Sequence, residues 1–174
     1  MKPFITDACK DGRCLLPFQF EGIKREQIEG MLLGKRIVAY ALPAGHSLGC
    51  AWQCRFIFGD SYALEFSSAC TVVAGWQEVG SLNVRFIPSG KADEGDAVFQ
   101  ECKIEGFSIA AVERLIYEDS HVYSECGLVF HERFGAEVIV AAGVSPGSVS
   151  IKAPFSKERF APEFAVGDYC CTSL

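Results

Sequence analysis

The sequence lacks the segments that would place the protein in or across a membrane. Its first residues, 1–7, contain no continuous apolar run of the kind that a secretory signal requires. No stretch approaches the ~20 consecutive apolar residues of a membrane-spanning helix. We therefore expect a cytoplasmic protein without a membrane partner.

The sequence is also short of basic residues. Its 16 Lys and Arg stand against 22 Asp and Glu, which gives a formal net charge of -6. Binding to a phosphate backbone requires clustered basic side chains that displace counterions, and none of the windows holds such a cluster. We expect no nucleic-acid partner. An acidic surface instead favours a basic protein partner, because complementary charge speeds encounter.

The motifs of common cofactor and nucleophile sites are missing as well. No GxxxxGK[ST] segment is present, and no GxGxxG segment follows a predicted strand, so the usual phosphate-binding loops are absent. Neither GxSxG nor a Ser-His-Asp order with recognisable local context occurs. We expect no cofactor, and these absences favour a protein that is not an enzyme.

Cysteine is abundant, but its spacing predicts neither disulfides nor a metal site. The nine cysteines are odd in number and irregularly spaced, which favours reduced thiols. Cys50 and Cys54 form a CxxxC and lack the CxxC spacing of redox motifs and zinc half-sites. With His46 they could form a zinc cluster, for which a fourth ligand is missing. We expect no metal, because Cys54 alternates with Phe56 and Phe58 as a small core hydrophobe.

What the sequence does contain is material for a β-rich core. The 174 residues suit a single domain over 1–174, and the apolar fraction of 49% with 14 Phe supplies its interior. Seventeen Gly and seven Pro indicate many turns and therefore short elements. The sequence predicts an α+β fold dominated by antiparallel sheet, with one or two helices.

The hydrophobic periodicity places the individual elements. Residues 22–34 carry apolar side chains at helical spacing and predict the best helix. Residues 98–104 are ambiguous, residues 109–117 are ambiguous with a local preference for helix, and residues 88–95 predict a loop. Strands are predicted at 36–42, 53–58, 62–66, 71–74, 81–87, 126–130, 136–142, 148–153 and 164–171.

A weak internal similarity suggests a duplication. A shift of 72 residues gives six identities over the 33 pairs that begin with Gly34 and Gly106. The identical pairs include Cys54 with Cys126, Phe58 with Phe130 and Glu65 with Glu137. This pattern suggests two related β units, 34–87 and 106–153, that pair around a pseudo-twofold axis.

The duplication singles out one pair of carboxylates. In a pseudo-symmetric fold Glu65 and Glu137 could face each other across the axis, and paired carboxylates support acid–base or glycosidic chemistry. The alternative is that each is a solvent-facing residue that keeps an apolar strand soluble and discourages edge pairing.

Two tryptophans are the aromatic candidates for a binding surface. Trp52 and Trp76 are both predicted near strand ends or turns, and large aromatic side chains are enriched at interface hot spots. Trp76 lies in a segment, 75–80, that is typical of an exposed loop, so it is the first candidate. The alternative for both is a place in the core.

The leading functional expectation is a non-enzymatic protein-binding domain, such as an inhibitor or an immunity-type neutraliser of a basic partner. Trp52, Trp76, Glu65 and Glu137 are its candidate binding residues, and a homodimer is left open. The alternative is a small-molecule or carbohydrate-binding or hydrolysing domain that uses Glu65 and Glu137 inside a β cavity. A pocket with convergent polar groups would favour the alternative, and an acidic or aromatic patch on a convex face would favour the first.

Overall fold

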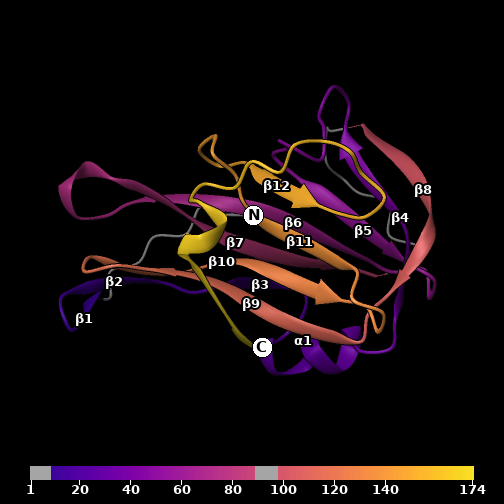
Figure 1. Cartoon of the computed structure of the whole chain (residues 1–174), viewed down its shortest axis with the longest axis horizontal. Helices are drawn as coiled ribbons and strands as arrows, with labels where there is room; N and C mark the ends of the chain where they lie inside the picture. The colour runs from indigo at the N-terminus through magenta and orange to yellow at the C-terminus, as the bar shows by residue number, and fades with distance from the viewer. Residues whose placement is uncertain (1–8, 89–97) are drawn as a thin grey trace.

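The computed structural model describes residues 9–88 and 98–174 (Figure 1). One α-helix, α1 (Arg25–Leu32), and two short 3-10 helices, η1 (Ala74–Trp76) and η2 (Val166–Asp168), accompany the strands in these residues. The strands are β1 (Cys9–Lys10), β2 (Arg13–Leu16), β3 (Gln19–Glu21), β4 (Arg36–Pro43), β5 (Cys54–Phe58), β6 (Ala63–Val72), β7 (Glu78–Ile87), β8 (Phe99–Ser108), β9 (Ala111–Glu118), β10 (Val122–His131), β11 (Glu137–Ala142), β12 (Val149–Lys152) and β13 (Tyr169–Ser173).

The strands form two sheets. Sheet 1 runs in the order β1-β2-β10-β11-β12, and β9 pairs with both β10 and β13. Sheet 2 runs in the order β3-β7-β6-β5-β4-β8. Pairing is antiparallel except between β2 and β10 and between β3 and β7. The predicted fold class, mostly antiparallel β with a helix, is confirmed.

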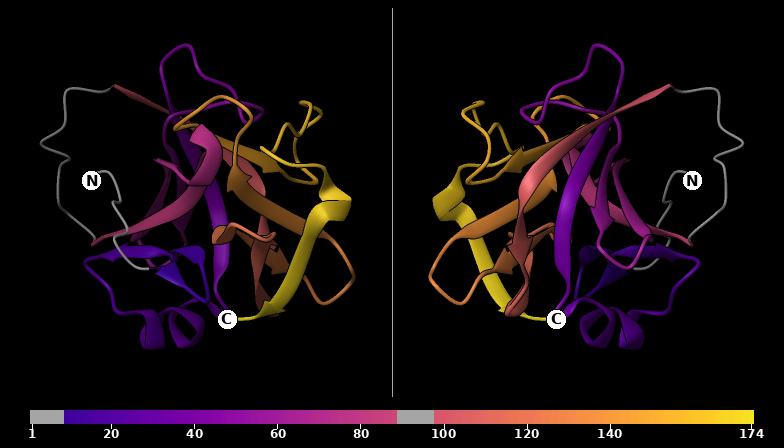
Figure 2. Two further views of the ribbon diagram at one scale, coloured as in Figure 1. Left: turned by 90° about the vertical axis from the view of Figure 1, so that its left-hand side faces the viewer. Right: turned by 90° about the vertical axis from the view of Figure 1, so that its right-hand side faces the viewer.

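The two sheets pack face to face, as Figure 2 shows from the two ends of the molecule, and the core between them is rich in phenylalanine. Phe56 of β5 and Phe66 of β6 contact Phe130 of β10 across the interface, with ring centroids 6.0 and 6.2 Å apart. The helix α1 adds Ile28 and Leu32 to the same core. These two residues are one helical turn apart, so the amphipathic pattern that predicted the helix also fixes its buried face.

The chain crosses from sheet 1 to sheet 2 between β2 and β3. The strand β3 then pairs with β7 only at residues 83–85, so the rest of that edge of β7 is left without a strand neighbour. Residues from sheet 1 and from the C-terminal segment reach this open edge.

Most predicted elements are present, with three corrections. The helical preference of residues 109–117 is wrong, since β9 pairs with β10 on one side and β13 on the other and backbone pairing overrides local propensity. The strand predicted at 71–74 ends at Val72, and the one predicted at 164–171 begins only at Tyr169. The ambiguous residues 98–104 belong to β8, and most of the predicted loop 88–95 lies outside the described residues.

The pseudo-twofold arrangement is not confirmed. The hairpins β5–β6 and β10–β11 do contain the matched residues, and Cys54, Phe58, Cys126 and Phe130 are all buried. However, β10 has a parallel neighbour in β2 and β5 has none, and the register irregularity lies on β10 in its pairing with β9 but on β4 in the pairing of β4 with β5. In the described part of the chain, no helix has the length and apolar character needed to span a bilayer.

Candidate functional site

Glu65 is buried inside sheet 2, where two arginines neutralise it. Its side chain is only 2% exposed, and register places it between Arg55 on β5 and Arg85 on β7. Arg55 Nε lies 2.8 Å from its Oε2, and Arg85 Nη2 lies 3.0 Å from its Oε1. A carboxylate satisfied in this way is a structural ion-pair group and has no spare charge for a substrate or partner.

Glu137, the other half of the predicted pair, is a surface residue at the start of β11. Its side chain is 42% exposed, and its Oε1 lies 3.5 Å from His131 Nδ1. The same histidine makes a closer contact of 2.7 Å, through Nε2, with Glu113. Glu137 therefore belongs to a surface cluster on sheet 1.

The fold does not bring Glu65 and Glu137 together. Strand alternation puts Glu65 on the face of β6 opposite Leu64 and Phe66, which point into the core. It likewise puts Glu137 on the face of β11 opposite the core residue Val138. The two carboxylates thus lie on opposite outer faces of the paired sheets and cannot act on one substrate.

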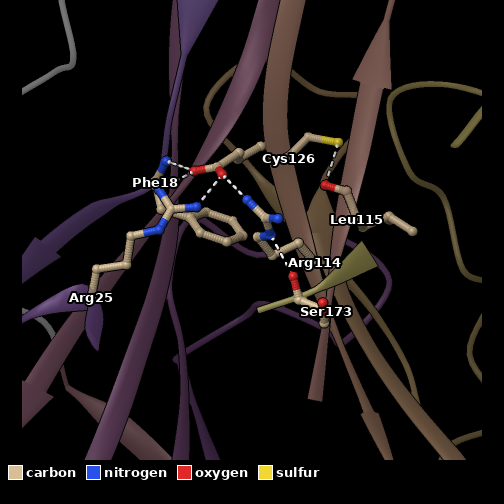
Figure 3. A network of polar contacts seen from close by, with 7 residues as sticks. Phe18, Arg25, Arg114, Leu115, Cys126 and Ser173 are labelled. Atoms are coloured by element: carbon tan, nitrogen blue, oxygen red, sulfur yellow. Dashed lines mark hydrogen bonds and ion pairs between the residues drawn. The ribbon is translucent and has the colours of Figure 1, made fainter. Parts of the chain in front are cut away.

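A second buried carboxylate, Glu125, has the same kind of environment (Figure 3). It accepts hydrogen bonds from the Phe18 amide at 2.8 Å, from Arg114 Nη1 at 2.8 Å and from two nitrogens of Arg25. Burial alone would raise the pKa of Glu125, but the bonds from Arg25, Phe18 and Arg114 outweigh it and lower that pKa. Glu125 therefore ties β10 to α1 and β9 as a charged carboxylate.

The two candidate tryptophans have different outcomes. Trp52 is 68% exposed, with His46 packed edge-on against it at a centroid distance of 5.3 Å. It remains a candidate surface aromatic. Trp76 is the last residue of η1, and its side chain lies outside the described part of the structure.

The alternative zinc cluster does not form. Cys54 is fully buried in the core, whereas Cys50 is exposed, and His46 Nδ1 accepts a bond from the Trp52 amide. Among the described residues, seven cysteines form no disulfide: Cys50, Cys54, Cys70, Cys102, Cys126, Cys170 and Cys171. No group of three or more His, Cys, Asp or Glu side chains among the described residues could hold a metal ion.

A cavity of about 200 Å³ opens where the core between the sheets ends. Leu64 and Phe66 point from β6 into the core, and alternation places Ser68 and Cys70 farther along the same face. Gly80 of β7 lies opposite Cys70. Small polar side chains and a glycine thus replace the phenylalanines of the core, and the space between the sheets becomes a pocket.

The pocket depends on Gly80. A Cβ at this position would lie 2.6 Å from the Cβ of Ala142 and 2.7 Å from Oε2 of Glu163, so only glycine fits. Gly80 lies on the open edge of β7. Its N–H donates to Glu163 Oε2 at 2.8 Å, and its carbonyl accepts from Ser124 Oγ at 2.7 Å.

Glu163 lies in the segment between β12 and η2. Its own N–H donates to the carbonyl of Ala142 at 2.9 Å, and the N–H of Val144 donates to the carbonyl of Ala161 at 3.0 Å. These bonds place residues 161–163 beside the end of β11, where the Glu163 side chain contacts Gly80. The turn between β11 and β12, with Gly143 and Gly147, completes the wall of the pocket.

The pocket perturbs the ionisation of its residues. Burial raises the pKa of Glu163 to about 7, with a further contribution from the nearby Glu78 and an opposing one from the Gly80 N–H. Burial also raises the pKa of the Cys70 thiol to about 11, and Glu78 and Glu163 add to this effect. Cys70 is therefore a protonated thiol at neutral pH, which argues against a role as nucleophile.

Glu163, which is half-buried, and Glu78, which is exposed, differ from the buried Glu65 and Glu125 in having no arginine partner among the described residues. Glu65 and Glu125 each contact two arginines, whereas neither Glu78 nor Glu163 takes part in any ion pair between described residues. A partly buried acidic pocket without its own cation is the most unusual electrostatic feature of the described structure. Such perturbed groups in a concavity are typical of functional sites.

An apolar groove of about 420 Å³ adjoins the pocket. Val144 and Glu163 line both hollows. Val144 and Val166 are 63% and 60% exposed, and Phe160 and Phe164 contribute to the groove. A small acidic pocket therefore opens beside a larger apolar surface.

Sequence reasoning missed this site. Its carboxylates are 85 positions apart, and Glu78 lies in the segment that predicted an exposed loop. Only the tertiary pairing of β6 with β7 and of residues 161–163 with β11 brings them together. Gly80 carried the nearest signal, since a glycine inside a strand often marks a close approach of another group.

Comparisons with protein-family models, with curated proteins and with solved structures find no match for this chain. With no related protein to indicate a function, the pocket is the feature of the structure from which a function is inferred.

Proposed function

We propose that this protein is a non-enzymatic binding domain that recognises a basic partner protein by accepting a Lys or Arg side chain between Glu78 and Glu163. The observation that carries the proposal is the pair of carboxylates in a concave pocket whose described lining contains no cationic side chain. The buried carboxylates Glu65 and Glu125, in contrast, each contact two arginines.

A cationic side chain supplies what the pocket lacks. Its charge would favour the ionised form of Glu163 and offset the cost of burying that charge. Charge-assisted hydrogen bonds from an ammonium or guanidinium group to carboxylates are about twice as strong as neutral ones. The pocket is thus complementary to a positive group and unfavourable for an anion.

The overall charge of the protein supports a basic partner. A net charge of -6 steers a basic protein toward the surface, and this steering weakens as salt rises because the Debye length is about 8 Å at physiological ionic strength. Inhibition or neutralisation of a basic partner is the role that these features suit. Trp52, exposed on the same chain, is a candidate anchor elsewhere in the interface.

The proposal can be tested with small probes that carry only the recognised group. N-acetyl-lysine methylamide and its arginine analogue are titrated into ¹⁵N-labelled protein at pH 7.5, with the neutral norleucine analogue as control. We expect saturable shifts centred on the Gly80 amide for the cationic probes alone. Glu163→Gln and Glu78→Gln should each weaken binding by roughly tenfold or more, since each removes a charge partner.

Glu137→Gln is the matched control, because it removes an exposed carboxylate far from the pocket and should leave the titration unchanged. Equal responses to the norleucine and lysine probes would refute the proposal, as would a Gly80 amide that neither cation perturbs.

One observation favours a second function, a hydrolase acting on a carbohydrate or another small molecule. Glu163 holds its proton up to about pH 7 beside a second carboxyl group, Glu78, and a protonated carboxyl with a second carboxyl beside it is the arrangement of a general acid and its partner base. Glu78 and Glu163 would then take the roles that the sequence suggested for Glu65 and Glu137.

The two functions predict different behaviour of the same variant. A panel of aryl glycosides and esters is assayed with the wild-type protein and with Glu163→Gln. Turnover that is present in the wild type and lost in the variant supports the hydrolase and contradicts the non-enzymatic proposal. Absence of turnover together with specific cation binding supports the binding domain.

A further inference from the structure

The acidic pocket and the apolar groove form one continuous surface with two chemically distinct halves. Val144 and Glu163 belong to both hollows, so nothing separates them. The pocket half offers two carboxylates and is closed at its base by Gly80. The groove half offers the exposed side chains of Val144 and Val166.

Charge differs between the two halves. Arg159 lines the groove together with Glu163, whereas the only charged residues in the described lining of the pocket are Glu78 and Glu163. A second cation in the groove would face Arg159, so the groove disfavours a basic residue and favours an uncharged one. The surface therefore matches a ligand with one positive group and one apolar group side by side.

An extended polypeptide presents such groups at a fixed spacing. Side chains at positions i and i+2 of a β-strand point to the same face, about 6.5–7 Å apart, whereas those at i and i+1 point to opposite faces. Two adjoining hollows on one surface can hold the i and i+2 side chains of one extended segment at the same time.

We infer that the site takes an extended segment of the partner in which a Lys or Arg stands two positions from an aliphatic residue. The basic side chain occupies the pocket between Glu78 and Glu163, and the aliphatic side chain packs between Val144 and Val166. This inference rests on the proposed function, to which it adds the sequence pattern of the partner.

Fluorescence anisotropy with labelled seven-residue peptides tests the pattern. The parent peptides contain Lys-Ala-Leu or Leu-Ala-Lys in a Gly/Ser background, and the comparison peptides contain Lys-Ala-Ala, Lys-Leu-Ala or Gln-Ala-Leu. We expect the better parent to bind roughly tenfold more tightly than Lys-Ala-Ala, because its leucine is buried in the groove. Lys-Leu-Ala should bind no better than Lys-Ala-Ala, since its leucine points away.

A groove variant separates this inference from the proposed function. Val166→Ser removes an aliphatic contact of the groove and leaves the pocket intact, so it should abolish most of the leucine advantage without changing the affinity for N-acetyl-lysine methylamide. Val98→Ser is the matched control, because Val98 is 73% exposed and lines neither hollow.

The outcomes are distinguishable. Binding of the lysine probe with no gain from leucine, or an equal gain in the Lys-Leu-Ala register, overturns the inference and leaves the proposed function standing. Failure of the lysine probe itself overturns both. A dimer in sedimentation analysis that dissociates on Glu163→Gln would identify a second copy of the chain as the occupant and would also overturn the inference.

Discussion

The ionisation of Glu163 should make the stability of this protein fall as pH rises from about 4.5 to about 7. The pKa of a glutamate in the unfolded chain is near 4.5, and burial in the pocket raises that of Glu163 to about 7. Between these two values the folded chain binds one proton more than the unfolded chain. The free energy of unfolding then decreases with rising pH, because stability falls wherever the native state holds more protons.

The size of the effect follows from the separation of the two pKa values. Each pH unit between them is worth about 1.4 kcal/mol, so the full separation corresponds to at most about 3 kcal/mol. Glu163 is only half-buried, and solvent screening reduces this figure. We expect an ionised Glu163 to destabilise the protein by about 1–2 kcal/mol above pH 7 and to have no such effect below pH 4.5.

The Glu163→Gln variant isolates the contribution of the Glu163 charge to the free energy of unfolding. Glutamine keeps a side-chain oxygen that can accept the Gly80 N–H bond but has no charge at any pH. The variant should therefore exceed the wild type in unfolding free energy by about 1–2 kcal/mol at pH 8 and match it near pH 5.

Urea unfolding of both proteins at pH 5, 6, 7 and 8 measures the difference between their unfolding free energies. The contributions of the other titrating groups are the same in both proteins and cancel in this difference. Glu137→Gln is the exposed control and should give a difference that does not vary with pH. A Glu163→Gln difference that is the same at all four pH values, or a variant less stable than the wild type at pH 8, would refute the reasoning.

Three further predictions concern the architecture around the site. Glu65→Gln should destabilise the fold by about 3 kcal/mol, because it removes the buried negative charge that Arg55 and Arg85 both contact, whereas Glu137→Gln should change stability by less than about 0.5 kcal/mol in the same urea assay. Cys54→Ser should cost about 1–3 kcal/mol by burying a hydroxyl, and Cys126→Ser should cost less, because its oxygen can keep the bond that the thiol donates to a backbone carbonyl. Gly80→Ala should cost about 1–3 kcal/mol by overpacking and should also abolish the NMR response to the lysine probe, because its Cβ fills the pocket.

The sequence predicted the fold class well because the pattern of apolar residues is local. The hairpin β5–β6 was predicted from two apolar runs around a short turn, and α1 from apolar residues at helical spacing. The failure at β9 has the opposite cause. Its residues 110–116 favour a helix locally, and only the strands on both sides of it, β10 and β13, determine that it is extended.

The candidate site could not be predicted in the same way. The matching of Glu65 with Glu137 was a one-dimensional argument, and it ignored the face of the strand on which each residue lies. Glu65 needs Arg55 and Arg85 beside it, and these contacts depend on the register of three strands. Glu163 is half-buried and has a raised pKa only because the chain after β12 returns to the end of β11. No local sequence pattern specifies this path.

The distribution of charge gives the pocket its significance. The formal charge of -6 suggests a uniformly acidic surface, but the buried carboxylates Glu65 and Glu125 each contact two arginines. Exposed carboxylates such as Glu137 cost almost nothing because water solvates them. Glu163 differs from both groups, since the pocket half-buries it and no arginine among the described residues pairs with it, whereas its neighbour Glu78 is exposed. Under the proposed function, a cation of the partner would compensate the Glu163 charge.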